Sequence, residues 1–133
     1  MLREYSLTTG QNNWTDITRQ VKDALRESGI ANGLCVVYCP HTTAGITINE
    51  NADPDVGREL IFALEKTYPD RAEFRHSEGN SASHLKASVI GSSVTIPVRN
   101  GRLLLGTWQG VYFCEFDGPR TRRFYVQILG EQA

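Results

Sequence analysis

The C-terminal third of the chain has the pattern of a series of short β-strands, and this pattern constrains the fold more than any other feature. Polar and apolar residues alternate over residues 93–98, as they do in a strand with one buried face. Asn100-Gly101 is typical of a two-residue hairpin turn, and residues 102–105 then form the returning strand. Further strands are expected at residues 109–116 and 122–129. We therefore expect a largely antiparallel sheet.

The first two thirds of the chain mix helices with strands. Apolar residues recur at the spacing of one helical face over residues 17–25, and Gly29 ends this helix. A second helix is expected to begin at Pro54, with Asp53 as its N-cap, and to end near Thr67. A third helix is expected at residues 82–90, and strands at residues 2–8, 33–39 and 43–49.

These elements predict an α+β fold. We expect a single compact domain covering residues 1–133, with a mainly antiparallel β-sheet of about six to seven strands packed with two to three helices. Hydrophobic residues make up 40% of the chain, which is enough to form a globular core.

Charge and cysteine content narrow the class of protein. The formal net charge of −1 disfavours a nucleic-acid-binding protein, which needs a basic face, although residues 120–123 form a local basic patch. Three cysteines without a repeated spacing do not indicate a disulfide framework, so we expect buried thiols in a reducing cytosol. The N-terminus lacks the pattern of a signal peptide, and no apolar run reaches transmembrane length. We expect a cytoplasmic protein without membrane contact.

Two of the three histidines enclose a segment of small and polar residues. His76 and His84 stand on either side of a carboxylate, a carboxamide, a glycine and three serines. His41 begins a similar cluster, residues 41–45, directly after an apolar run at residues 34–38 and Cys39-Pro40. We therefore expect His41, His76 and His84 to share one pocket, where they are candidate metal ligands. Alternatively, they are hydrogen-bonded structural histidines, since their spacing matches no tight zinc motif.

The segment between these histidines also has the features of an anion site. It precedes an expected helix, whose first N–H groups lack partners within the helix, and its glycine can adopt a positive φ. A phosphate or pyrophosphate is the expected ligand, and an ordinary helix cap is the alternative. The candidate anion-binding residues are Ser77, Glu78, Gly79, Asn80 and Ser81.

Two strand ends carry further candidates. Glu50 follows an expected strand and lies between two asparagines, which suits a general base or a metal ligand, and equally a surface residue. Trp108 and Gln109 lie between Gly106 and Gly110, which allow a bulge or a close backbone approach. Trp108 can stack on a planar ring while Gln109 hydrogen-bonds its polar edge, and a core tryptophan at a sheet bend is the alternative.

These segments together resemble a known family. Residues 41–50, 76–87 and 101–109 look like the corresponding segments of the YjbQ family, also called UPF0047, and Gly106-Thr107-Trp108-Gln109 is the most specific part. The resemblance extends over nearly the whole chain.

The resemblance implies a compact α+β fold, a homotrimer and a polar pocket near the subunit contacts. It also implies a secondary thiamine-phosphate synthase activity, in which a pyrimidine pyrophosphate is joined to a thiazole phosphate and pyrophosphate leaves. The expected partner is thus a phosphorylated small molecule, and the expected cofactor a divalent metal, zinc or magnesium. The candidate catalytic residues are Glu50, His76 and His84. The alternative is an oligomer that binds a metal or an anion without strong catalysis.

Overall fold

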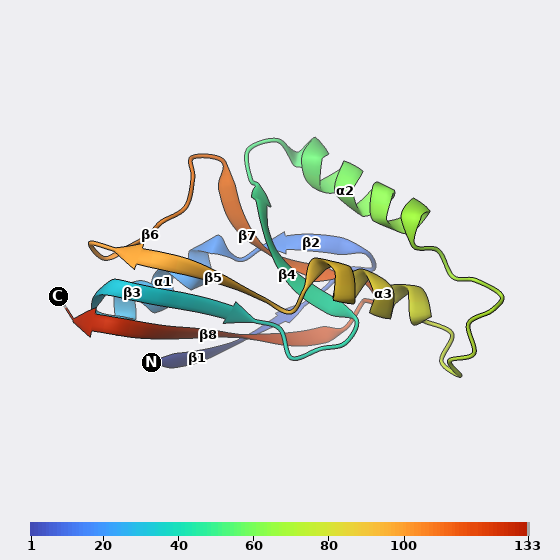
Figure 1. Cartoon of the computed structure of the whole chain (residues 1–133), viewed down its shortest axis with the longest axis horizontal. Coiled ribbons are helices and arrows are strands. Elements are labelled where there is room, and N and C mark those ends of the chain that lie inside the picture. Colours follow the sequence, from blue (N-terminus) through green and yellow to red (C-terminus); the bar gives the residue numbers. More distant parts are fainter. Residues whose placement is uncertain (133) are drawn as a thin grey trace.

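The computed structural model describes residues 1–132, and the chain contains eight strands and three helices over these residues (Figure 1). The strands are β1 (Leu2–Thr8), β2 (Asn13–Asp16), β3 (Ile30–Tyr38), β4 (Ala44–Glu50), β5 (Ser93–Arg99), β6 (Arg102–Leu103), β7 (Gln109–Glu115) and β8 (Thr121–Gln132). The helices are α1 (Thr18–Ser28), α2 (Pro54–Thr67) and α3 (Ser81–Ile90).

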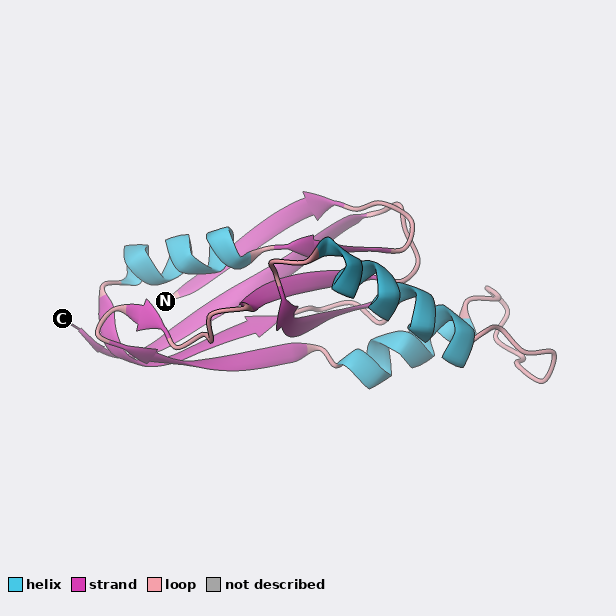
Figure 2. Cartoon of the chain, turned by 90° about the horizontal axis from the view of Figure 1, so that it is seen from above, coloured by secondary structure: helices cyan, strands magenta, loops and turns pink. Residues whose placement is uncertain are grey.

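The strands form two antiparallel sheets. A five-stranded sheet has the order β1-β8-β3-β5-β6, and a three-stranded sheet has the order β2-β7-β4. Seen from above, α1 lies toward one end of the molecule, and α2 and α3 lie toward the other (Figure 2). The loop between α2 and α3 projects from that second end.

The main core fills the space between the two sheets. Alternate residues of the five-stranded sheet point inward, such as Cys35 and Val37 of β3, which are fully buried. The three-stranded sheet contributes Ile46 and Phe113, and α1 contributes Val21. Burial of these apolar side chains is the main favourable term that holds the sheets together.

The opposite face of the three-stranded sheet is covered by α2 and α3, with a smaller core around Cys114, Phe116 and Ala87. Helix α3 approaches β4 closely at Gly45, where an added Cβ atom would lie 2.6 Å from the carbonyl oxygen of Gly91. That oxygen accepts a hydrogen bond of 3.0 Å from the Ile46 N–H group. Only glycine permits this contact, which fixes α3 against the sheet.

The outer face of the five-stranded sheet carries exposed apolar side chains. Leu34 and Leu129 are paired across β3 and β8, and they are 47% and 58% exposed. Tyr38 on the same face of β3 is 46% exposed. No helix in residues 1–132 covers this outer face. Helix α1 lies behind the sheet in Figure 1, on the side where Val21, Ala24 and Leu25 join the main core.

The predicted α+β class is confirmed, and the predicted elements occur with small shifts in their ends. Residues 1–132 form eight strands, one more than expected, because the short polar strand β2 was not predicted. These strands form two sheets rather than one. The expected strand 102–105 shrinks to β6, since the Leu105 N–H group donates to the Leu103 carbonyl in a tight turn. No helix among residues 1–132 combines the length and the apolar character needed to cross a membrane.

Candidate functional site

The three histidines line one cavity, with a volume of about 320 Å³. His41 lies in the segment between β3 and β4, His76 in the loop between α2 and α3, and His84 in α3. The rings of His76 and His84 are nearly perpendicular, at 85°, and their centroids are 5.2 Å apart. The structure thus brings together side chains that lie up to 43 residues apart in sequence (84 − 41).

One of these histidines is held in a defined orientation. The Nε2 atom of His41 accepts a hydrogen bond of 3.0 Å from the Arg123 N–H group. Burial and the nearby charge of Arg122 lower the pKa of His41, which favours the neutral ring. A neutral ring that accepts at Nε2 carries its proton on Nδ1. His41 therefore has a hydrogen-bond donor left at Nδ1, and its Nε2 lone pair is not free for a metal.

A buried ion pair forms the inner wall of the cavity. The Arg122 side chain donates from Nε to Glu115 Oε1 at 2.8 Å and from Nη2 to Glu115 Oε2. Nη2 also donates to Thr43 Oγ1 at 2.8 Å. The two charged residues are only 5% and 1% exposed. Arg122 lines the cavity, and its Nη1 atom has no partner among residues 1–132. The guanidinium is thus held in place while the two N–H groups of Nη1 remain free to bind a ligand.

The carboxylate of Glu115 is stabilised in its charged form. Burial alone raises its pKa, but hydrogen bonds from Arg122, Thr9 Oγ1 and the Asp117 N–H group outweigh burial and hold the pKa below its ordinary value. Glu115 therefore stays ionised at neutral pH and fixes the charge and direction of Arg122.

A second arginine stands at the mouth of the cavity. Arg120 donates from Nε to the Asp117 carbonyl at 2.7 Å and from Nη2 to the Asp117 carboxylate at 2.9 Å. Asn80 donates to the same carboxylate at 2.8 Å. The other side-chain atom of Asn80, Oδ1, is buried and has no donor among residues 1–132. Because a buried acceptor without a donor is costly, this atom is suited to a ligand N–H or O–H group.

The predicted anion-binding turn contributes two side chains to the cavity lining, and one of its backbone N–H groups has a partner in the described chain. Glu78 and Asn80 line the cavity, whereas Ser77, Gly79 and Ser81 do not. Gly79 has the expected positive φ, of 72°, and its N–H group donates to the His76 carbonyl. The Ala82 N–H group donates to the Asp70 carboxylate. The N–H groups of Ser77, Glu78, Asn80 and Ser81 have no partner among residues 1–132, so the anion-binding role of this turn stays a prediction.

The other predicted residues lie at the opposite end of the three-stranded sheet. Glu50 is paired with Gln109 at one end of β4 and β7, and Ala44 with Glu115 at the other. Ala44 and Glu50 are six residue steps apart along β4, which corresponds to about 20 Å in an extended strand. Trp108 is 63% exposed, and Gln109 Oε1 accepts a hydrogen bond from the Gly106 N–H group. Within one chain, these residues do not join the histidines.

The side chains as placed do not fit a metal ion. Among residues 1–132, no three or more His, Cys, Asp or Glu side chains converge as metal ligands. His76, His84 and Glu78 line one cavity, but Glu78 belongs to an exposed turn. A metal bound by these three residues would therefore require the turn to move.

Sequence reasoning missed the ion pair and the second arginine. In the sequence, residues 120–123 form a basic patch, and alternation in β8 points Arg122 inward and Arg123 outward. Alternation along the two strands could have predicted the ion pair, because it places Arg122 of β8 and Glu115 of β7 at inward positions.

Comparison with known proteins defines the class to which this chain belongs. Residues 3–131 match the family described as UPF0047 protein YjbQ-like. The UPF0047 protein YugU of Bacillus subtilis is 56% identical over 124 residues, which are 92% of this chain and 94% of the relative. A UPF0047 protein of Methanocaldococcus jannaschii is 50% identical over 133 residues, 99% of this chain and 96% of the relative.

Solved structures agree with this assignment. A YjbQ/UPF0047 protein from Clostridium acetobutylicum has a TM-score of 0.93 at 56% identity, covering 96% of this chain and 99% of that one. A YbjQ-like protein of unknown function from Sulfolobus solfataricus has a TM-score of 0.94 at 33% identity, covering 98% and 97%. The chain belongs to the YjbQ/UPF0047 family.

Proposed function

We propose that the histidine cavity binds the phosphate or pyrophosphate group of a small-molecule substrate. The observation that supports this most directly is Arg122. Its guanidinium is fixed by Glu115 and Thr43, while Nη1 has no partner in the described part of the chain. The His41 Nδ1–H group and Arg120 add donors to the same lining. Arginine N–H groups fixed in advance suit phosphate oxygens, because little ordering is required on binding.

The reaction we propose is the one that the family resemblance suggests: a pyrimidine pyrophosphate is joined to a thiazole phosphate, and pyrophosphate leaves. Negative charge develops on the leaving pyrophosphate as its bond to carbon breaks. Donors directed at that group stabilise the charge, and this kind of stabilisation is a large part of catalysis. His76 and His84, with neighbouring rings, are the candidates for proton transfer in the cavity.

Glu50, which the sequence offers as a catalytic residue, is not part of the histidine cavity within one chain. It lies about 20 Å from the histidine end along β4, and its backbone carbonyl accepts a hydrogen bond from the Tyr112 hydroxyl at 2.8 Å. A catalytic role for Glu50 would require a neighbouring subunit to bring it to the cavity. We therefore assign proton transfer in the proposed reaction to His76 and His84 and not to Glu50.

A homotrimer is part of the proposal, and the outer face of the five-stranded sheet supports it. The exposed leucines and tyrosine of β3 and β8 form an apolar surface that a second copy would cover. This face ends at Arg123, whose N–H group holds His41, so a subunit contact there would border the cavity.

The second candidate function is metal binding without strong catalysis. The close rings of His76 and His84 favour it, together with Glu78 on the same lining. Glu78 also repels a phosphate unless a cation lies between them, so a divalent metal, held once the Glu78 turn has moved toward the two histidines, would assist anion binding.

Titration calorimetry with pyrophosphate, with and without chelator, separates the two candidates. We expect saturable binding that weakens by about tenfold or more in His84→Ala and in Arg120→Gln, because each loses one charge-assisted or polar contact. Arg19→Gln, on the exposed surface of α1, is the matched control and keeps the wild-type affinity.

The outcomes have distinct meanings. Binding that disappears with chelator supports the metal candidate, and binding that survives chelator supports the direct anion site. No binding at millimolar pyrophosphate in either condition contradicts the phosphate proposal. If pyrophosphate binds, mixing the two phosphorylated substrates tests catalysis, and a lack of thiamine phosphate above the protein-free rate leaves an anion-binding protein.

A further inference from the structure

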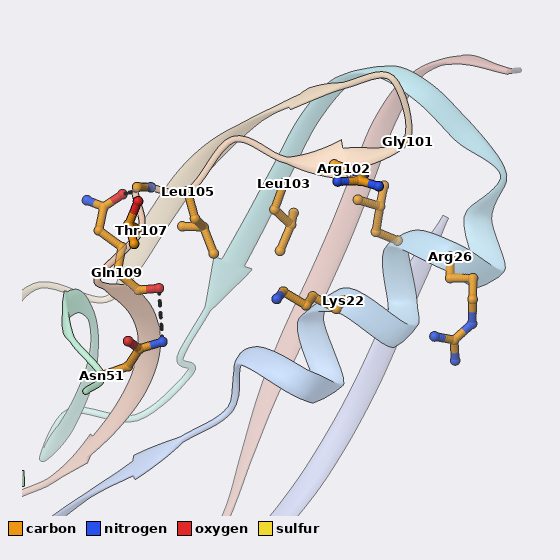
Figure 3. Close-up of a pocket in the computed structure, with 11 residues that line it drawn as sticks. Lys22, Arg26, Asn51, Gly101, Arg102, Leu103, Leu105, Thr107 and Gln109 are labelled. Atoms are coloured by element: carbon orange, nitrogen blue, oxygen red, sulfur yellow. Dashed lines mark hydrogen bonds between the residues drawn. The ribbon is translucent and has the colours of Figure 1, made fainter. Parts of the chain in front are cut away.

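A second cavity lies away from the histidines and is larger, with a volume of about 570 Å³. Its walls come from α1, the hairpin of β5 and β6, the loop between β6 and β7, and Asn51 (Figure 3). It contains most of the Gly106–Gln109 segment but none of the residues that line the histidine cavity. We call it the Lys22 groove.

The charges on this groove all have one sign. Lys22, Arg26 and Arg102 line it, and no aspartate or glutamate of residues 1–132 does. Arg26 pairs with Asp23 at 2.9 Å, outside the lining, whereas Lys22 and Arg102 form no ion pair within the described chain. Two unpaired cations on one concave surface repel each other, so the groove is favourable for an anion.

The remaining surface of the groove is apolar. Leu25, Leu103 and Leu105 line it, and Leu25 is nearly fully buried. Figure 3 shows the Leu103 and Leu105 side chains projecting toward Lys22. A ligand that fills this space would therefore contact leucine side chains over much of its surface, which inorganic phosphate cannot do.

The wall beside these leucines is held in place by hydrogen bonds. Gln109 Oε1 accepts from the Gly106 N–H group at 2.8 Å, and Asn51 Nδ2 donates to the Gln109 carbonyl at 3.3 Å (Figure 3). The Asn51 N–H group donates to the Trp108 carbonyl at 2.9 Å. These bonds fix the loop between β6 and β7 against Asn51. A wall ordered in advance lowers the cost of binding.

We propose that the Lys22 groove binds a small organic anion, with its acidic group at Lys22 and Arg102 and an apolar or planar body against Leu103 and Leu105. Phosphate, carboxylate and sulfonate groups share the chemistry that the two cations require. This site goes beyond the proposed function, because it uses other residues and stands or fails independently of the histidine cavity.

The test is a fluorescence titration of the full chain with 8-anilinonaphthalene-1-sulfonate, an aromatic sulfonate. The wild-type protein is expected to bind the dye saturably. The double variant Lys22→Gln/Arg102→Gln should bind about tenfold more weakly, because two exposed charge contacts are lost. Arg99→Gln removes one charge from the same hairpin outside the groove, and it should change the affinity by less than about twofold.

Arg120→Gln, in the histidine cavity, is the second control and should leave dye binding unchanged. Both substituted side chains of the double variant are exposed, and circular dichroism will show that it is folded. Dye affinity that is equal in the wild type and the double variant overturns the proposal, as does loss of dye binding in Arg120→Gln. A dye that does not saturate the wild-type protein also overturns it.

Discussion

Replacing Glu115 with glutamine tests the buried ion pair that shapes the histidine cavity. The Glu115 carboxylate accepts hydrogen bonds from Thr9, from the Asp117 N–H group and from two Arg122 nitrogens. A glutamine amide keeps one acceptor oxygen, but its nitrogen can accept nothing. Two donors on the Oε2 side, Arg122 Nη2 and the Asp117 N–H group, then lose this acceptor, and Arg122 keeps a buried charge without a counter-ion.

The expected cost follows from these losses. A buried donor without a partner costs about 1–3 kcal/mol, and breaking a buried ion pair from one side costs about 3–5 kcal/mol. We expect Glu115→Gln to lower the free energy of unfolding by about 3–5 kcal/mol, a large part of the roughly 5–15 kcal/mol of a typical domain. With an m-value of roughly 2 kcal/mol per molar, the urea midpoint falls by about 2 M.

The assay is urea unfolding followed by tryptophan fluorescence, and pH supplies an internal check. The pKa of Glu115 is lowered from its ordinary value of 4.5, so its stabilising effect is fully present above that value and is lost as the pH falls through the native pKa. The difference between wild type and variant should therefore shrink in acid. A variant that loses less than about 1 kcal/mol at neutral pH would refute the reasoning.

A double variant separates stability from ligand binding. Glu115→Leu with Arg122→Met replaces the ion pair by apolar groups, and such exchanges are often close to neutral for stability. We expect this protein to remain folded and to lose pyrophosphate binding, because the Arg122 donors are gone. A folded double variant with wild-type affinity for pyrophosphate would show that Arg122 does not contact the ligand.

Three further outcomes are expected. Burial raises the pKa of the Cys35 and Cys39 thiols to about 11, and that of the Cys114 thiol well above its ordinary value. A thiol reagent at pH 8 should therefore modify none of them until the protein unfolds, and rapid labelling of any of the three would contradict this. Leu129→Lys should lower the mass measured by light scattering if the outer sheet face joins subunits, and an unchanged mass argues against that face. Gln109→Ala should cost about 1 kcal/mol and speed hydrogen exchange at Gly106, whose acceptor it removes; unchanged exchange there would contradict the assigned contact.

The main elements of the fold could be predicted because their signals are local. Alternation over β5 and β8, the Asn100-Gly101 turn and the Asp53-Pro54 helix start all depend on neighbouring residues. The division into two sheets could not be predicted, since it depends on which distant strands pair. Strand β2 has only four residues, and three of them are polar, as in a loop. It is a strand because β7 pairs with it.

The grouping of the candidate site was only partly visible in the sequence. His41, His76 and His84 could be placed together because each lies in a cluster of small and polar residues beside an apolar element, and they line one cavity. Glu50 and Trp108 were also candidates from their local sequence, but the antiparallel register of β4 and β7 places them at the far end of the sheet. Local patterns identify polar clusters, whereas strand register decides which clusters meet.

The most direct test of the central claim is a crystal structure of the protein soaked with pyrophosphate in the absence of divalent metal. The account predicts density in the histidine cavity, with phosphate oxygens within hydrogen-bond distance of Arg122 Nη1 and His41 Nδ1. Density confined to the Lys22 groove, or a histidine cavity without pyrophosphate at a concentration that saturates the protein in solution, would contradict it.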